Sequence, residues 1–138
     1  DMSTLRQVLD VLIAAGVMIE ATDDGRLRLK ALFESRPIED DVRDLCREHK
    51  QMLMDYLRFA RAADQLLLDS SNRIGAAWSE ACDTLECDHT WDDHEAVIHD
   101  AYWSMDLERL RHAVEGRERY ALAALEEQRR RHAWGLNR

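Results

Sequence analysis

Helix-breaking residues are scarce in this chain, and their scarcity limits the folds that it can adopt. Only one of the 138 residues is proline, and five are glycine. Proline removes a backbone hydrogen bond from a helix interior, and glycine weakens a helix by about 1 kcal/mol relative to alanine. The single proline, Pro37, lies in the first third of the chain. The sequence therefore predicts a mainly α-helical protein with long helices after Pro37.

A segment of different character lies at residues 17–31. Apolar side chains occupy alternate positions on both sides of the turn Asp23-Asp24-Gly25. The alternating apolar positions are Val17, Ile19, Ala21, Leu27, Leu29 and Ala31. Such alternation around a glycine-containing turn predicts one β-hairpin. Because a two-stranded hairpin is not stable alone, one face should lie on helices, while its outer edges stay open to a partner strand.

Apolar residues at helical spacing flank this hairpin. Before it, they predict a helix that is capped by Ser3 and ends near Ala15, because Gly16 is suited to stop a helix. After Pro37, they predict a short helix with Val42 and Cys46 on its apolar face. We therefore expect helices to cover one face of the hairpin.

The rest of the chain carries a helical apolar pattern with few interruptions. The pattern predicts either one long helix over residues 49–85 or two helices with a break near Ser70. A loop is expected at residues 86–90, followed by a helix over residues 91–103. Ser104 is then expected to cap a last helix.

Charge is distributed unevenly along the chain. The formal net charge of −9 opposes direct binding to nucleic acid, because affinity for phosphates comes mainly from Lys and Arg. Neither occurs between Arg73 and Arg109, whereas the last part of the chain is rich in arginine. The acidic stretch has three interpretations: a solvated face, a surface that folds against the last helix, or a mimic of nucleic acid for a basic partner. The candidate residues for such a mimic are Asp92, Asp93 and Glu95.

The sequence contains no pattern that carries enzyme chemistry. It has no glycine-rich phosphate loop and no CxxC or HExxH motif. Residues of metal-binding types gather at Cys82, Cys87, His89, His94 and His99, but their spacing is not that of a closed zinc site. We therefore expect no catalytic residues, no cofactor and no metal, with zinc binding at these residues as a lesser alternative.

The location of the protein is indicated by what its sequence lacks. No apolar run approaches the roughly 20 residues that span a bilayer, and the N-terminus does not resemble a signal peptide. Three widely spaced cysteines are typical of reduced thiols rather than of a disulfide framework. We therefore expect a cytoplasmic protein with no membrane partner.

Three sequence runs carry a resemblance to a known family: GVMIE at residues 16–20, GRLRLK at residues 25–30 and LCREHKQMLMDYLR at residues 45–58. Together they resemble the TubC N-terminal docking domain family, a small αββαα module, over residues 3–60. The matching residues are Leu12, Gly16, Val17, Ile19, Gly25, Arg26, Leu27, Arg28, Leu29, Val42, Leu45, Arg47, Lys50, Leu53 and Leu57. The arginine-rich helices that follow are similar to those of hypothetical proteins from bacterial mobile elements.

The resemblance implies a docking module over residues 1–68 and a helical extension over residues 69–138. It also implies a homodimer whose hairpin receives an acidic peptide tail as an added strand. The implied partner-binding residues are Ile19, Arg26, Leu27, Arg28, Leu29 and Lys30. The apolar ones would supply shape and the cations would pair with carboxylates.

Two functional hypotheses from different classes follow. The leading one is a non-catalytic docking or adaptor protein that binds an extended acidic peptide at the edge of its hairpin. The alternative is an acidic decoy, an anti-defence inhibitor of a nucleic-acid-binding protein encoded by a phage or plasmid, which acts through Asp92, Asp93 and Glu95.

Overall fold

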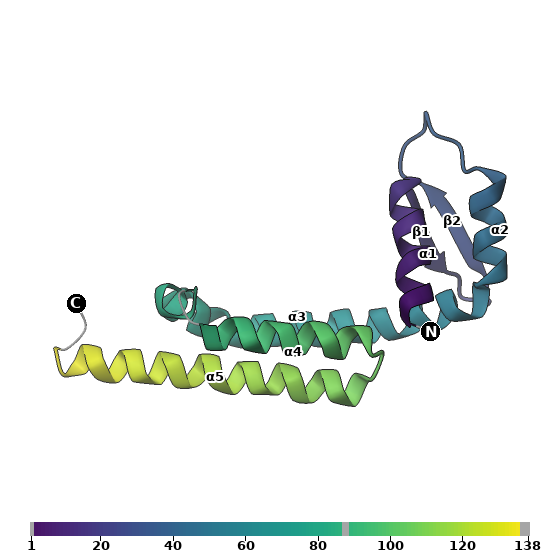
Figure 1. Ribbon diagram of the computed structural model, residues 1–138. Coiled ribbons are helices and arrows are strands. Elements are labelled where there is room, and N and C mark those ends of the chain that lie inside the picture. The colour runs from purple at the N-terminus through teal and green to yellow at the C-terminus, as the bar shows by residue number, and fades with distance from the viewer. Residues whose placement is uncertain (1, 87–88, 136–138) are drawn as a thin grey trace. The chain divides into compact units, whose positions relative to one another are not determined.

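The computed structural model describes residues 2–86 and 89–135 and forms helices with a single β-hairpin (Figure 1). In chain order, the elements are α1 (Met2–Ala14), β1 (Val17–Ala21), β2 (Leu27–Ala31), α2 (Asp40–Glu48), α3 (Lys50–Glu86), α4 (His89–Trp103) and α5 (Leu107–Ala133). The prediction of a mainly α-helical fold with one hairpin is confirmed. None of the described helices is long and apolar enough to cross a membrane.

The chain divides into two compact units, residues 1–61 and residues 62–138. The boundary lies within α3, after residue 61. The resemblance implied a boundary after residue 68. The first unit has the order helix, strand, strand, helix, helix, and the second unit is entirely helical in its described part.

The first unit packs helices against the hairpin. Its buried apolar side chains are Leu5, Val8, Leu12, Val17, Val42, Cys46, Leu53, Met54 and Ala60. The three from α1 follow the spacing of one helical face. Gly16 has a φ of 68° and lets the chain turn from α1 into β1, where the ring of Phe33 approaches it closely. Ser3 is not the N-cap of α1, because the helix already begins at Met2.

The predicted hairpin is confirmed, with its strands paired antiparallel. Ile19 lies opposite Leu29, and Glu20 lies opposite Arg28. Gly25 has a φ of 81°, a conformation that glycine adopts without strain. Because side chains alternate along a strand, the apolar positions share one face and the charged positions share the other.

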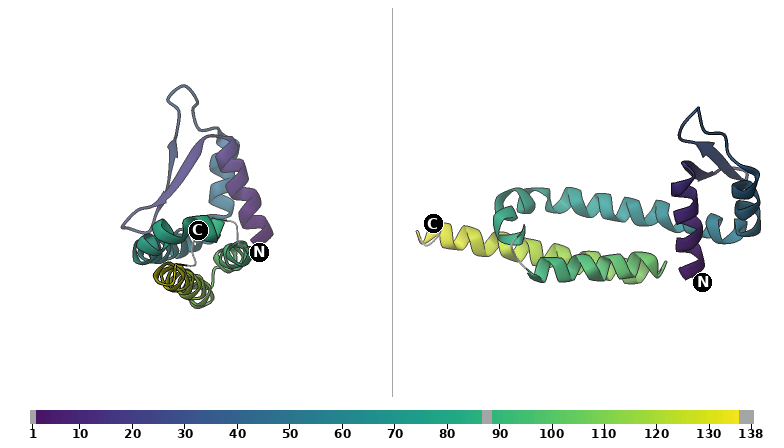
Figure 2. Two further views of the ribbon diagram at one scale, coloured as in Figure 1. Left: turned by 90° about the vertical axis from the view of Figure 1, so that its left-hand side faces the viewer. Right: turned by 45° about the horizontal axis from the view of Figure 1, so that its top comes forward.

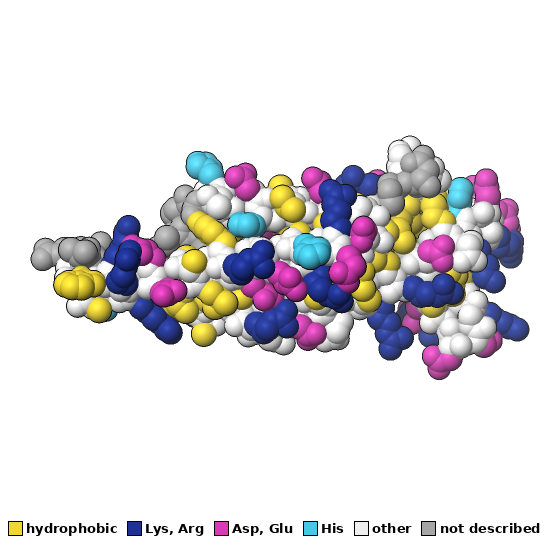
Figure 3. Space-filling model, turned by 90° about the horizontal axis from the view of Figure 1, so that it is seen from below, with side chains coloured by type: hydrophobic (Ala, Val, Ile, Leu, Met, Phe, Trp, Pro, Cys, Tyr) yellow, Lys and Arg dark blue, Asp and Glu magenta, His cyan; other side chains and the backbone are white. Residues whose placement is uncertain are grey.

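The second unit is built from the later part of α3 together with α4 and α5, which lie side by side (Figure 2). One apolar cluster joins the three helices and contains Ile74, Ala77, Ala81, Trp91, Ala121 and Leu125. Ion pairs also tie them together: Arg73 to Glu118, Glu80 to Arg129, and Glu95 to Arg117. Basic and acidic side chains are interspersed over the visible face in Figure 3.

Several boundaries in this unit refine the sequence expectations. α3 is continuous through Ser70, which is fully buried, so the single-helix alternative is the one observed. Of the loop expected at residues 86–90, residues 87–88 lie outside the described part, while Glu86 ends α3 and His89 begins α4. The N-cap of α5 is Asp106 rather than Ser104, because the Asp106 carboxylate accepts the Arg109 amide at 3.1 Å.

Candidate functional site

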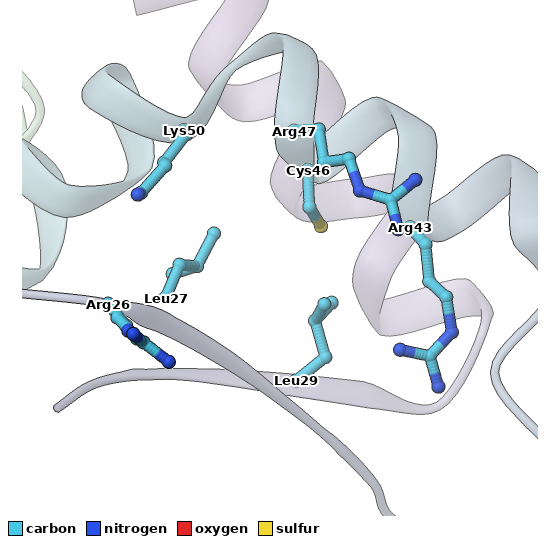
Figure 4. A pocket seen from close by; sticks show the side chains of 7 residues that line it. All are labelled: Arg26, Leu27, Leu29, Arg43, Cys46, Arg47 and Lys50. Carbon is cyan, nitrogen blue, oxygen red and sulfur yellow. The ribbon is translucent and has the colours of Figure 1, made fainter.

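A groove separates β2 from α2 within the first unit and encloses about 390 Å³ (Figure 4). The residues that line it are Arg26, Leu27, Leu29, Arg43, Cys46, Arg47 and Lys50. They come from the end of the turn, from β2, from α2 and from the first residue of α3. We call this hollow the β2–α2 groove.

The floor of the β2–α2 groove is apolar. Leu27 and Leu29 point from β2 toward α2, and Cys46 points from α2 toward the strand (Figure 4). Both leucines stay only half-buried, whereas Val17 on β1 is buried. Burial raises the pKa of the Cys46 thiol, so the side chain stays neutral and acts as part of the apolar floor. The helices therefore cover β1 more completely than β2.

The charged side chains that line the groove are all cations. Arg43 and Lys50 have no ion-pair partner among the described residues. Arg47 pairs with Asp44 at 2.8 Å, and Arg26 pairs with Asp24 at 3.3 Å. These pairs join exposed side chains, and such pairs contribute little because water and salt screen them. In a chain with a net charge of −9, the groove is thus a local concentration of positive charge that is available to an anion.

The hydrogen bonds of the hairpin show which backbone groups of β2 point away from β1. The Thr22 amide donates to the Arg26 carbonyl, and the Leu32 amide donates to the Gly16 carbonyl. In an antiparallel pair, every second residue directs its amide and carbonyl at the partner strand. Counting inward from these two bonds, Arg28 and Lys30 are the residues of β2 that direct theirs at β1.

The remaining β2 residues, Leu27, Leu29 and Ala31, consequently point their amides and carbonyls away from β1. The outer edge of β2 is thus an unfilled strand position. The residues that expose these backbone groups include both leucines of the groove floor.

The structure distributes the predicted partner-binding residues over two faces of the hairpin. Ile19, Leu27 and Leu29 share the apolar face, whereas Arg28 and Lys30 project from the opposite one. Arg28 is paired with Glu20 of the neighbouring strand, and Arg26 lies at the groove.

The cations that line the groove from the helices, Arg43, Arg47 and Lys50, were not among the predicted partner-binding residues. The sequence did contain a pattern that could have identified them. They are spaced by four and three residues, which places side chains on one side of a helical segment.

The predicted acidic surface lies at the start of α4. Asp92 and Asp93 are exposed. Glu95 accepts a hydrogen bond of 2.9 Å from Arg117 of α5, so this carboxylate already has a basic partner within the unit. Part of the acidic stretch therefore folds against the arginine-rich last helix.

The histidines considered for metal binding occupy different surroundings. The ring of His94 packs on Tyr120 with centroids 5.2 Å apart, and His99 lies beside Asp100 and Trp103. Where side chains are described, no three His, Cys, Asp or Glu residues come together in a group suited to a metal ion. The side chains of Cys82 and Cys87 lie outside the described residues.

Comparison with known proteins adds no relative from which a role can be transferred. No family model, curated protein or solved structure matches this chain.

Proposed function

We propose that the first unit is a non-catalytic docking module that binds an extended, acidic segment of a partner protein along the outer edge of β2. The observation that carries the proposal is the coincidence of an open strand edge with a groove whose charged lining is entirely basic. Either feature alone would admit many ligands. Together they favour a peptide that is both extended and negatively charged.

Each part of the edge has a role in such a complex. The outward amides and carbonyls of Leu27, Leu29 and Ala31 would pair with the peptide backbone. The half-buried leucines would become covered by the added strand, and burial of apolar area stabilises a complex by roughly 25 cal/mol per Å² before the costs of association. The cations would supply selectivity and speed the encounter.

Strand addition has a residue-specific signature in amide hydrogen exchange. With the blocked peptide acetyl-(Glu-Thr)4-amide as probe, we expect exchange to slow at Leu27, Leu29 and Ala31, because these amides gain partners. The amides of Arg28 and Lys30 should change little, because they already bond within the hairpin. Acetyl-(Lys-Thr)4-amide serves as the probe of opposite charge.

The matched variants reverse two charges each. Arg43→Glu with Lys50→Glu should abolish binding of the glutamate peptide, and the control Arg58→Glu with Arg61→Glu, which lies outside the groove, should retain it. Circular dichroism verifies that both variants fold. No binding of the glutamate peptide, equal binding of the lysine peptide, or binding without the alternate pattern of protection would refute the proposal.

A further inference from the structure

We infer that the β2–α2 groove selects peptides with carboxylates at every second residue, in register with Arg43, Arg47 and Lys50. This inference rests on the proposed docking function and specifies which acidic segments the site accepts. The ligand class is an extended peptide with acidic side chains at alternating positions, preferably glutamates.

The first support is the repeat distance of the cations. Arg43 and Arg47 are four residues apart on α2, which corresponds to about 6 Å along a helix axis. Residues i and i+2 of a β-strand are about 6.7 Å apart and project from the same face. The two repeats nearly match, so successive carboxylates on one face of an added strand would meet successive arginines.

The cation row continues along the groove beyond α2. Lys50 is three residues after Arg47 and lies toward Leu27, whereas Arg43 lies toward Leu29 (Figure 4). The row thus follows the direction of β2 over the residues whose backbone edge is open. A strand on this edge would run beside all three cations.

The second support is the contrast between the two faces of the hairpin. Side chains of an added strand alternate between the groove face and the opposite face. On the opposite face the cations are Arg28, which lies beside the carboxylate of Glu20, and Lys30. The groove face carries four cations, Arg26, Arg43, Arg47 and Lys50, and no carboxylate among its lining residues. Two consecutive acidic residues would therefore place only one carboxylate in the groove.

The chemistry of the floor favours glutamate over aspartate. Leu27, Leu29 and Cys46 form an apolar surface between the backbone edge and the cations. The longer aliphatic stem of glutamate covers this surface while its carboxylate reaches the cations. Placing the ion pairs next to an apolar floor also reduces their screening by water.

The test compares two peptides of identical composition by isothermal titration calorimetry. Acetyl-(Glu-Thr)4-amide can place all its carboxylates on one face, whereas acetyl-(Glu-Glu-Thr-Thr)2-amide can place only half of them there. We expect the block peptide to bind about tenfold more weakly, a difference of about 1.4 kcal/mol. Acetyl-(Asp-Thr)4-amide should bind more weakly than its glutamate counterpart.

Variants on the two faces locate the source of the preference. Arg43→Gln with Arg47→Gln should bring the ratio of the two dissociation constants toward one, and Arg28→Gln with Lys30→Gln should leave the ratio near ten. Equal affinities for both glutamate peptides, or a ratio that collapses only in the Arg28 and Lys30 variant, would overturn the inference and leave the docking proposal standing. Failure of both peptides to bind would instead overturn the docking proposal itself.

Discussion

At the residue scale, Arg117 is the one charged residue that is buried in the described part of the chain. Its side chain is only 10% exposed, and it donates a 2.9 Å hydrogen bond to Glu95. The guanidinium also lies over the Trp91 ring, 5.4 Å from the centroid, while its Nε atom has no partner. Glu95 is 47% exposed, so water reaches the carboxylate of the pair far more than the guanidinium.

This asymmetry predicts unequal effects from the two halves of the pair. Glu95→Ala leaves a buried guanidinium without its acceptor and should lower the free energy of unfolding by about 1–3 kcal/mol. Arg117→Met keeps volume in the core and returns a half-exposed carboxylate to water, so its effect should be smaller or even stabilising. Urea denaturation of both variants measures the difference, and a greater loss in Arg117→Met would contradict this description of the pair.

At the element scale, side-chain hydrogen bonds determine where the last helix begins. Both Ser104 and Asp106 are residue types that cap helices. The Ser104 hydroxyl donates to the Ala101 carbonyl at the end of α4, and Met105 has a φ of 57° between the two helices. Ser104 thus belongs to the end of α4, and Asp106 caps α5.

The cap predicts a specific pattern of stability changes. Asp106→Ala removes the acceptor of the Arg109 amide and should cost about 1 kcal/mol. Asp106→Asn retains an acceptor and should stay within a few tenths of a kcal/mol of the original protein. Thermal unfolding followed by circular dichroism compares the two, and equal losses would show that the hydrogen bond is not what stabilises this end of α5.

At the scale of the whole molecule, acidic and basic segments that are far apart in sequence meet in the helical unit. The hydrogen bond from Arg129 lowers the pKa of the Glu80 carboxyl. Burial raises the pKa of Glu118, but the hydrogen bond from Arg73 and nearby positive charge outweigh it and leave the pKa below its ordinary value. Both carboxylates therefore link α3 to α5 in their ionised form.

These pKa shifts predict loss of stability in acid. Because the folded pKa values lie below the ordinary glutamate value, the unfolded chain binds protons more readily as pH falls. The contribution of the two carboxylates is present above that ordinary value and is lost as pH falls through the folded values. Urea midpoints between pH 7 and pH 3 should decrease more for the original chain than for the variant Glu80→Gln with Glu118→Gln. Parallel decreases in both proteins would count against this origin.

The sequence by itself determined those features that depend on local pattern. The alternation of Ile19, Leu27 and Leu29 around a glycine turn requires a hairpin, and the apolar stripe of α1 requires a helix. The sequence left open whether α3 continues through Ser70. Serine favours helix ends, but it also occurs inside a helix where tertiary packing buries it, as it does here.

Only the tertiary structure decided which cations share a surface. Arg26, Arg28 and Lys30 form an alternating row in sequence, but strand geometry turns Arg28 and Lys30 away from the groove. Arg43 and Lys50 join the groove because the fold places α2 and the start of α3 across the groove from β2, an arrangement that no local pattern specifies. The hairpin was therefore predictable from its residues, whereas the β2–α2 groove arises only when the helices pack beside it.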